Sequence, residues 1–130
     1  MSDANGGPAI VLESRGATRV NGSWRIHWRV TNEGGEPVRL LAVRAPHRRF
    51  RSEAVDLNVV VAGSASVDQT ARVEVAPGEA IDDGVVVFVA VRDRETWRIQ
   101  FRVRVAVTAD ATLAATVVAR SAERIGSSVG

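Results

Sequence analysis

Apolar and polar residues alternate along most of this chain, which is the pattern of half-buried β-strands. In SWRIHWRVTN, residues 23–32, one face carries the apolar side chains of Trp24, Ile26, Trp28 and Val30. The opposite face carries Arg25, His27 and Arg29. The segment therefore predicts a strand with both tryptophans in the core and the basic residues in solvent.

Comparable segments recur about every 12 residues, separated by turn signals such as Asn21-Gly22 and Gly34-Gly35. The last of them, LAATVVAR, could be strand or helix, and its Thr and Val content favours strand. The predicted strands are residues 9–14, 23–32, 38–45, 54–62, 70–75, 85–91, 97–108 and 113–120.

Short strands without helices predict an all-β fold. Seven or eight strands favour a two-sheet antiparallel immunoglobulin-like β-sandwich over residues 9–120, with a small closed barrel as the alternative. We expect residues 1–8 to be a flexible N-terminus and residues 121–130 a flexible tail, because both are polar and terminal.

The strands on either side of RDRET, residues 92–96, are expected to form a hairpin. Odd-numbered residues are taken to face inward in both strands, so paired numbers share parity and the loop must have an odd length. This register turns alternate residues outward into a small surface patch, which we expect a second copy or a partner to cover. The predicted interface comprises Val86, Phe88, Arg102 and Arg104.

Two motifs carry a family resemblance. W-x-I-x-W-x-V-x-N-x-G-x-x-P-V-x-L spans residues 24–40, and V-x-P-G-E at residues 75–79 precedes a valine-rich strand. In this order they resemble bacterial immunoglobulin-like domains of the cell-adhesion-related (CARDB-like) kind, over most of residues 10–108. The resemblance implies a β-sandwich and supplies no catalytic residues. We therefore expect a non-enzymatic interaction or accessory module that binds a protein partner or itself.

Composition bears on the class of protein, on disulfide and metal sites, and on the partner. The chain is 45% hydrophobic and 25% charged, as globular domains are. It has no cysteine, which excludes disulfides and thiolate metal sites. All 17 basic residues are arginine, yet the net charge is only +2, so nucleic acid is permitted but not favoured as a partner.

The first residues lack the basic and apolar regions of a secretory signal, and no apolar run is long enough to span a bilayer. We therefore expect a cytoplasmic protein without a membrane partner. A domain excised from a longer secreted chain would carry the same sequence.

RAPHRRF and the arginine after it form the most basic segment. Basic groups around one aromatic ring can hold a phosphate backbone while the ring stacks on a base. The alternative function is therefore polyanion or nucleic-acid binding through this predicted loop, by Arg44, His47, Arg48, Arg49, Phe50 and Arg51. In the competing interpretation the loop is a solvated connection and Phe50 packs at the edge of the core.

Other chemistry is weakly indicated. His27 and His47 have no metal-ligand spacing, and Asp82-Asp83 fits a polar turn better than a calcium loop. The serines lack a nucleophile-elbow context. We expect no enzymatic activity, no cofactor and no metal site.

Overall fold

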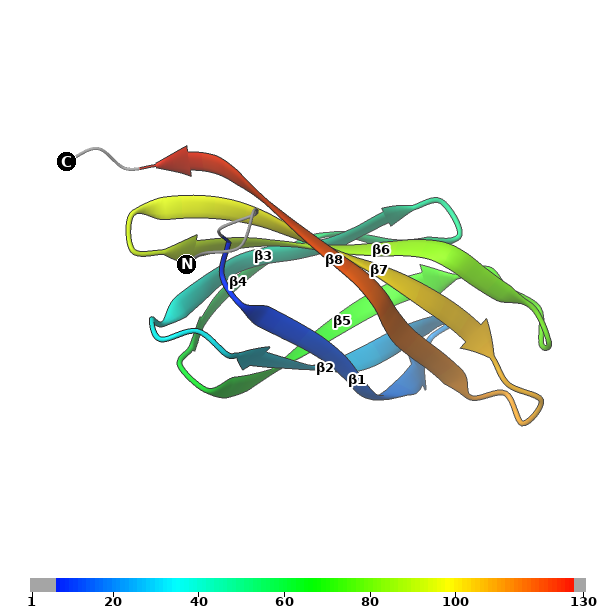
Figure 1. The fold of residues 1–130 in the computed structure, drawn as a ribbon. Helices are drawn as coiled ribbons and strands as arrows, with labels where there is room; N and C mark the ends of the chain where they lie inside the picture. The colour runs from blue at the N-terminus through cyan, green and yellow to red at the C-terminus, as the bar shows by residue number, and fades with distance from the viewer. Residues whose placement is uncertain (1–6, 128–130) are drawn as a thin grey trace.

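The computed structural model describes residues 7–127, which form eight strands and no helix (Figure 1). The all-β antiparallel prediction is confirmed. Nowhere between residues 7 and 127 does the chain form a helix with the length and hydrophobicity that membrane crossing needs. The strands are β1 (Ile10–Val20), β2 (Ser23–Asn32), β3 (Val38–His47), β4 (Phe50–Val61), β5 (Ser64–Val73), β6 (Ala80–Arg92), β7 (Glu95–Val107) and β8 (Leu113–Ser127).

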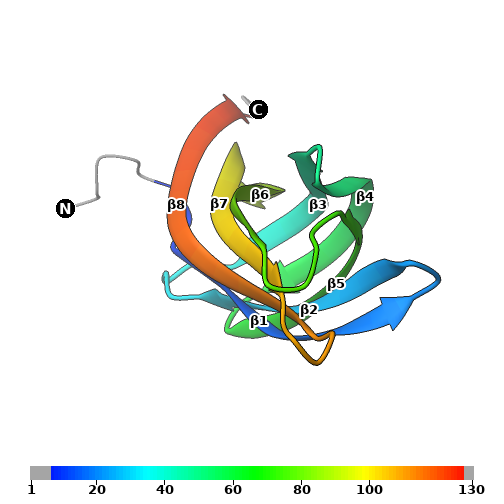
Figure 2. The ribbon, with the colours of Figure 1, turned by 90° about the vertical axis from the view of Figure 1, so that its right-hand side faces the viewer.

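All eight strands belong to one hydrogen-bonded sheet, in the order β1-β2-β5-β4-β3-β6-β7-β8. The sheet curls into a half-barrel, so the edge strands β1 and β8 approach each other (Figure 2). The predicted two-sheet sandwich is not confirmed, because β4 and β5 join the two sides of the curl.

The junction between β4 and β5 is very short. Its ladder contains only the pairs Phe50–Val73 and Arg51–Arg72. Beyond these pairs β4 forms ladder pairs only with β3, and β5 only with β2. The sheet therefore nearly divides into a part made of β1, β2 and β5 and a part made of the other five strands.

Alternation in β2 correctly identified the buried face. Trp24 and Trp28 are 6% and 1% exposed. The indole Nε1 of Trp28 donates to Oε1 of Gln69 on β5, at 2.9 Å. Gln69 is itself 1% exposed, so this bond satisfies the buried indole N–H and the buried amide oxygen. The Nε2 of Gln69 has no hydrogen-bond partner among residues 7–127.

The β6–β7 hairpin differs from the prediction. Arg92 pairs with Glu95 across a two-residue turn, and Asp93 in that turn has a φ of 57°. The predicted odd-length loop is therefore wrong. So is the outward placement of Val86 and Phe88, which are both 0% exposed.

The two-residue turn and a β-bulge in β6 together account for this difference. The register shifts between Ile81 and Gly84, after which the even-numbered residues of β6 face the core. Phe88 then packs edge-on against Phe101, with ring centroids 6.0 Å apart. Every residue in 85–91 is apolar, so their polarity could not identify the inner face.

β8 is longer than predicted. Residues 113–120 form a strand, as favoured, but the strand continues and pairs with β7 as far as Ser127. Residues 121–127 are therefore not the expected tail. Of the predicted flexible N-terminus, residues 7 and 8 are described and precede β1. Residues 1–6 and 128–130 lie outside the described residues.

Gly84→Ala tests the packing at the bulge. An added Cβ would lie 2.9 Å from the Val103 carbonyl oxygen and 3.2 Å from Cδ2 of Phe50. We expect this variant to lower the free energy of unfolding by about 1–3 kcal/mol, measured by urea denaturation. The matched control is Gly63→Ala, where a Cβ meets nothing within 4 Å, and its change should stay within about 0.5 kcal/mol. Equal effects of the two substitutions would contradict the close packing at Gly84.

Candidate functional site

The Arg-rich segment 44–51 is a hairpin tip rather than a connection between two sheets. It comprises the end of β3, a turn at Arg48-Arg49, and the start of β4, with His47 opposite Phe50. Successive residues of a strand point to opposite faces. The residues predicted to form one site therefore lie in different surroundings.

Phe50 lies in the core. Its side chain is 0% exposed, and its ring edge faces the backbone of Gly84 in β6. A ring in this position cannot stack on a base. The interpretation that placed Phe50 at the core is confirmed, and the nucleic-acid interpretation loses its aromatic platform.

His47 and Arg49 hold the hairpin tip in place. The backbone N–H of Arg49 donates to Nδ1 of His47 at 3.0 Å, which leaves the proton on Nε2. Nε2 then donates to Oδ1 of Asp83 on the β6 bulge, also at 3.0 Å. Arg49 Nε donates to the carbonyl oxygen of Glu74 at 3.0 Å. These contacts are structural ties between the tip and its neighbours.

The other three arginines of the segment face solvent. Arg44, Arg48 and Arg51 are exposed, and none makes a hydrogen bond or ion pair with any residue from 7 to 127. Of the predicted binding residues, only these three are both exposed and unpaired, so only they can bind an anion without breaking an existing contact.

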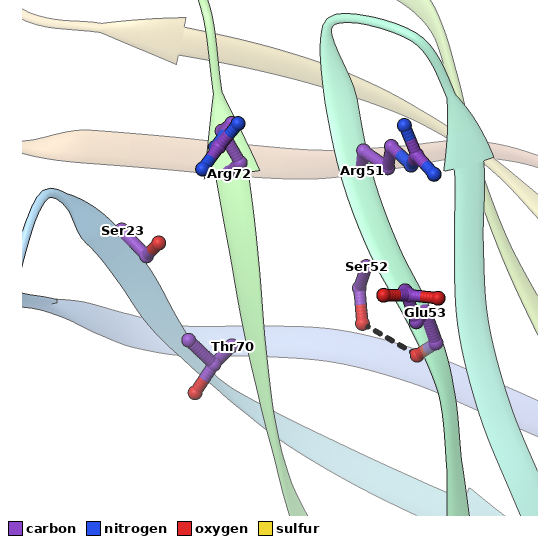
Figure 3. Close-up of a pocket in the computed structure, with 6 residues that line it drawn as sticks. All are labelled: Ser23, Arg51, Ser52, Glu53, Thr70 and Arg72. Atoms are coloured by element: carbon purple, nitrogen blue, oxygen red, sulfur yellow. Dashed lines mark hydrogen bonds between the residues drawn. The ribbon is translucent and has the colours of Figure 1, made fainter.

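A polar pocket opens where β4 and β5 separate (Figure 3). Its volume is about 360 Å³, and Arg51 and Arg72 lie directly opposite each other at its edge. Sequence reasoning missed this pocket because β2, β4 and β5 contribute to it, and only strand pairing brings them together. The lining residues are Ser23, Arg51, Ser52, Glu53, Thr70 and Arg72.

A mainly apolar groove lies between the two edge strands, β1 and β8. Its volume is about 260 Å³, and Val11 and Val118 on its sides are 44% and 49% exposed. The Arg120 guanidinium donates to the Pro8 carbonyl oxygen, which ties β8 to the residues before β1. The groove is lined by Ile10, Val11, Leu12, Phe101, Val117, Val118, Ala119 and Arg120.

The predicted interface residues do not form one surface. Val86 and Phe88 belong to the core, whereas Arg102 and Arg104 are exposed on the outer face. Arg104 Nε donates to Asp82 on β6 at 3.1 Å. The two-residue turn accounts for the correction, because it pairs the even-numbered residues of β6 with the inward odd-numbered residues of β7 as far as the bulge.

Titratable side chains elsewhere stabilise turns and strand surfaces. His27 lies 3.0 Å from Thr18 Oγ1 and 2.9 Å from Asp68 Oδ1, and so links β1, β2 and β5. At the β7–β8 turn, the Thr108 hydroxyl donates to Asp110, which lowers the pKa of that carboxyl. Among residues 7–127, no three His, Cys, Asp or Glu side chains gather as a metal site would require.

In comparisons with known protein families, curated proteins and solved structures, nothing matches this chain. The resemblance to CARDB-like immunoglobulin domains therefore stays a prediction.

Phe50→Ala separates a core role from a ligand-binding role. Because the ring is fully buried, we expect the substitution to lower the free energy of unfolding by about 3–5 kcal/mol in urea denaturation. Arg48→Ala at the exposed tip should change it by less than about 0.5 kcal/mol. A loss below about 1 kcal/mol for Phe50→Ala would contradict its place in the core.

Proposed function

We propose that the chain is a non-enzymatic, immunoglobulin-like interaction module that associates with a second copy of itself along β8. Strand order supports the immunoglobulin-like part of the proposal. In an immunoglobulin domain the neighbours are A-B-E-D in one sheet and C-F-G in the other. The first seven strands here have the same linear order of neighbours, β1-β2-β5-β4-β3-β6-β7, with β8 added beside the last. They differ in that β4 pairs mainly with β3 and forms only two pairs with β5.

The open edge of β8 is the observation that carries the proposal. This strand is 15 residues long, pairs with β7 on one side, and has no ladder partner on the other among the described residues. Edge strands present unpaired N–H and C=O groups that accept another strand. Between its two register shifts, residues 119–124 form a regular segment to which a strand can be added. Addition there requires the contact of Arg120 with the Pro8 carbonyl oxygen to give way.

β1 is a poorer docking edge. Gly16 has a φ of 122°, and the register with β2 shifts between Ser14 and Ala17. Such a bulge interrupts a regular row of backbone groups and protects an edge from pairing. Arg15 and Arg19 add charge at the same place.

The charges on β8 select one register for two antiparallel copies. Directly opposed residues must share a face, so a twofold axis passes through one residue of the segment. An axis at Ser121 places Arg120 opposite Ala122 and Ala119 opposite Glu123. Moving the axis to residue 120 or 122 places Arg120 opposite Arg120 or Arg124, which is destabilising.

A single cysteine tests this register, because the chain has no cysteine of its own. In the proposed dimer, Ser121→Cys places two thiols directly opposite each other, where Cβ atoms are about 4.5–5.5 Å apart. We expect mild oxidation to give disulfide-linked dimers, measured by non-reducing electrophoresis. Wild-type sedimentation should show reversible self-association that Ser121→Arg weakens by placing like charges opposite each other.

Gln100→Cys is the matched control. Gln100 lies on β7 directly opposite Ser121 and is also exposed. Its copies would be three strand spacings apart, about 14 Å, which is too far for a disulfide. Equal cross-linking of the two variants, or a wild type that stays monomeric at high micromolar concentration, would overturn the proposal.

Polyanion binding is the second candidate function, and the unpaired Arg44, Arg48 and Arg51 favour it. If these side chains contact phosphates or sulfates, changing all three to Gln should abolish retention on heparin at low salt. Wild-type retention should fall steeply as salt rises, because each neutralised phosphate releases counterions. Unchanged retention of the triple variant would remove this candidate.

A further inference from the structure

The β4–β5 junction contains a pairing that sheets avoid. Arg51 lies directly opposite Arg72, and like charges in this position destabilise a strand pair. The Phe50–Val73 pair is the only other pair between these strands, so the repulsion falls at the narrowest link in the sheet.

In the β6–β7 and β7–β8 pairs the register places an arginine opposite a carboxylate. Arg98 pairs with Glu123 across β7 and β8, and the two side chains form an ion pair. Arg92 lies opposite Glu95 in the β6–β7 hairpin, 3.9 Å away. Arg51 and Arg72, by contrast, are exposed and form no hydrogen bond or ion pair within the described part of the chain.

The pocket beside this pair offers neutral donors. Thr70 is two residues before Arg72 on the same face of β5. Ser23 lies beside Arg72, one residue beyond the Trp24–Ala71 pair. Their hydroxyl groups make no hydrogen bond with residues 7–127, and hydroxyls can donate to an oxyanion. Ser52 differs, because its hydroxyl already donates to the Glu53 carbonyl oxygen at 3.0 Å (Figure 3).

We propose that this pocket binds a phosphate or sulfate group between Arg51 and Arg72. Each guanidinium can donate two parallel hydrogen bonds to such an anion, which would replace their mutual repulsion with two attractions. In Figure 3 the Arg51 guanidinium points away from β5. Binding therefore includes rotation of this side chain toward Arg72.

Glu53 sets the size of the ligand. Its exposed carboxylate also lines the pocket and has no ion-pair partner in residues 7–127. A negative charge here repels a long chain of phosphates or sulfates more than a compact anion held between the arginines. The site therefore fits a single phosphate or sulfate group, free or at the end of a larger molecule.

The experiment uses inorganic phosphate as the probe, titrated into the full chain at constant ionic strength. We expect saturable binding by calorimetry, and at ten times the Kd a rise in Tm of about 3–6 °C. Arg51→Gln and Arg72→Gln should each weaken binding at least tenfold, and Glu53→Gln should strengthen it. Without phosphate, Arg72→Gln should melt no lower than wild type, because the substitution removes a repulsion.

Arg29→Gln is the matched control. Arg29 is exposed on β2 and makes no hydrogen bond or ion pair within residues 7–127, but it does not line the pocket. Phosphate binding by this variant should stay within twofold of wild type. An equal loss in Arg29→Gln and Arg72→Gln would mean general charge attraction and would overturn the proposal.

Two further outcomes test whether the pocket binds phosphate. No saturable binding up to about 10 mM phosphate would overturn the site, even if heparin were retained through the hairpin tip. Amide chemical-shift changes that gather around residues 23, 51, 70 and 72 of the wild type would support it without relying on a variant. A phosphate ester in place of inorganic phosphate then distinguishes a free anion from the terminal group of a larger ligand. Cross-linking along β8 is independent of all these measurements.

Discussion

Phe50 contacts three parts of the half-barrel at once. Its backbone lies opposite His47 in the β3–β4 hairpin and opposite Val73 in the short β4–β5 ladder. Its ring faces Gly84, where β6 bulges and leaves room because there is no side chain. Burial of one phenylalanine thus stabilises the hairpin tip, the bulge and the junction that keeps the sheet continuous. The polar contacts that tie the tip to its neighbours, from His47 to Asp83 and from Arg49 to Glu74, lie around Phe50.

Sequence alternation was sufficient to identify the buried residues of a strand where its two faces differ in polarity. β2 and β7 each have one apolar and one basic face, so the buried residues Trp28 and Phe101 were identified correctly. β6 is apolar on both faces, and there the register depended on a bulge and a two-residue turn that polarity does not encode. The prediction of where β8 ends was wrong for the opposite reason. As an edge strand it buries little, and residues 121–127 have the composition of a tail.

The candidate sites were less predictable than the fold. Nearness in sequence suggested that residues 44–51 act together, but a strand sends neighbouring side chains to opposite faces. Phe50 therefore entered the core while Arg51 faced solvent. The polar pocket depends on the reverse effect, in which strand order brings Ser23, Arg51 and Thr70 together from three separate strands. Such a site becomes visible only when the pairing partners of each strand are known.

The narrow β4–β5 junction also has a consequence for how the molecule opens. Hydrogen exchange divides many proteins into cooperative units that open separately, and boundaries between units fall where few interactions cross. Here β1, β2 and β5 meet the remaining strands through one two-pair ladder, the packed inner face, the β1–β8 contact and a few side-chain bonds, among them Asn32 Nδ2 to the Val61 carbonyl oxygen. Opening along this line would expose the backbone of β4 and β5 without breaking any of the hairpins. By this criterion β1, β2 and β5 form one unit and the other five strands form a second unit. The Arg51–Arg72 pair lies at the boundary between the two units.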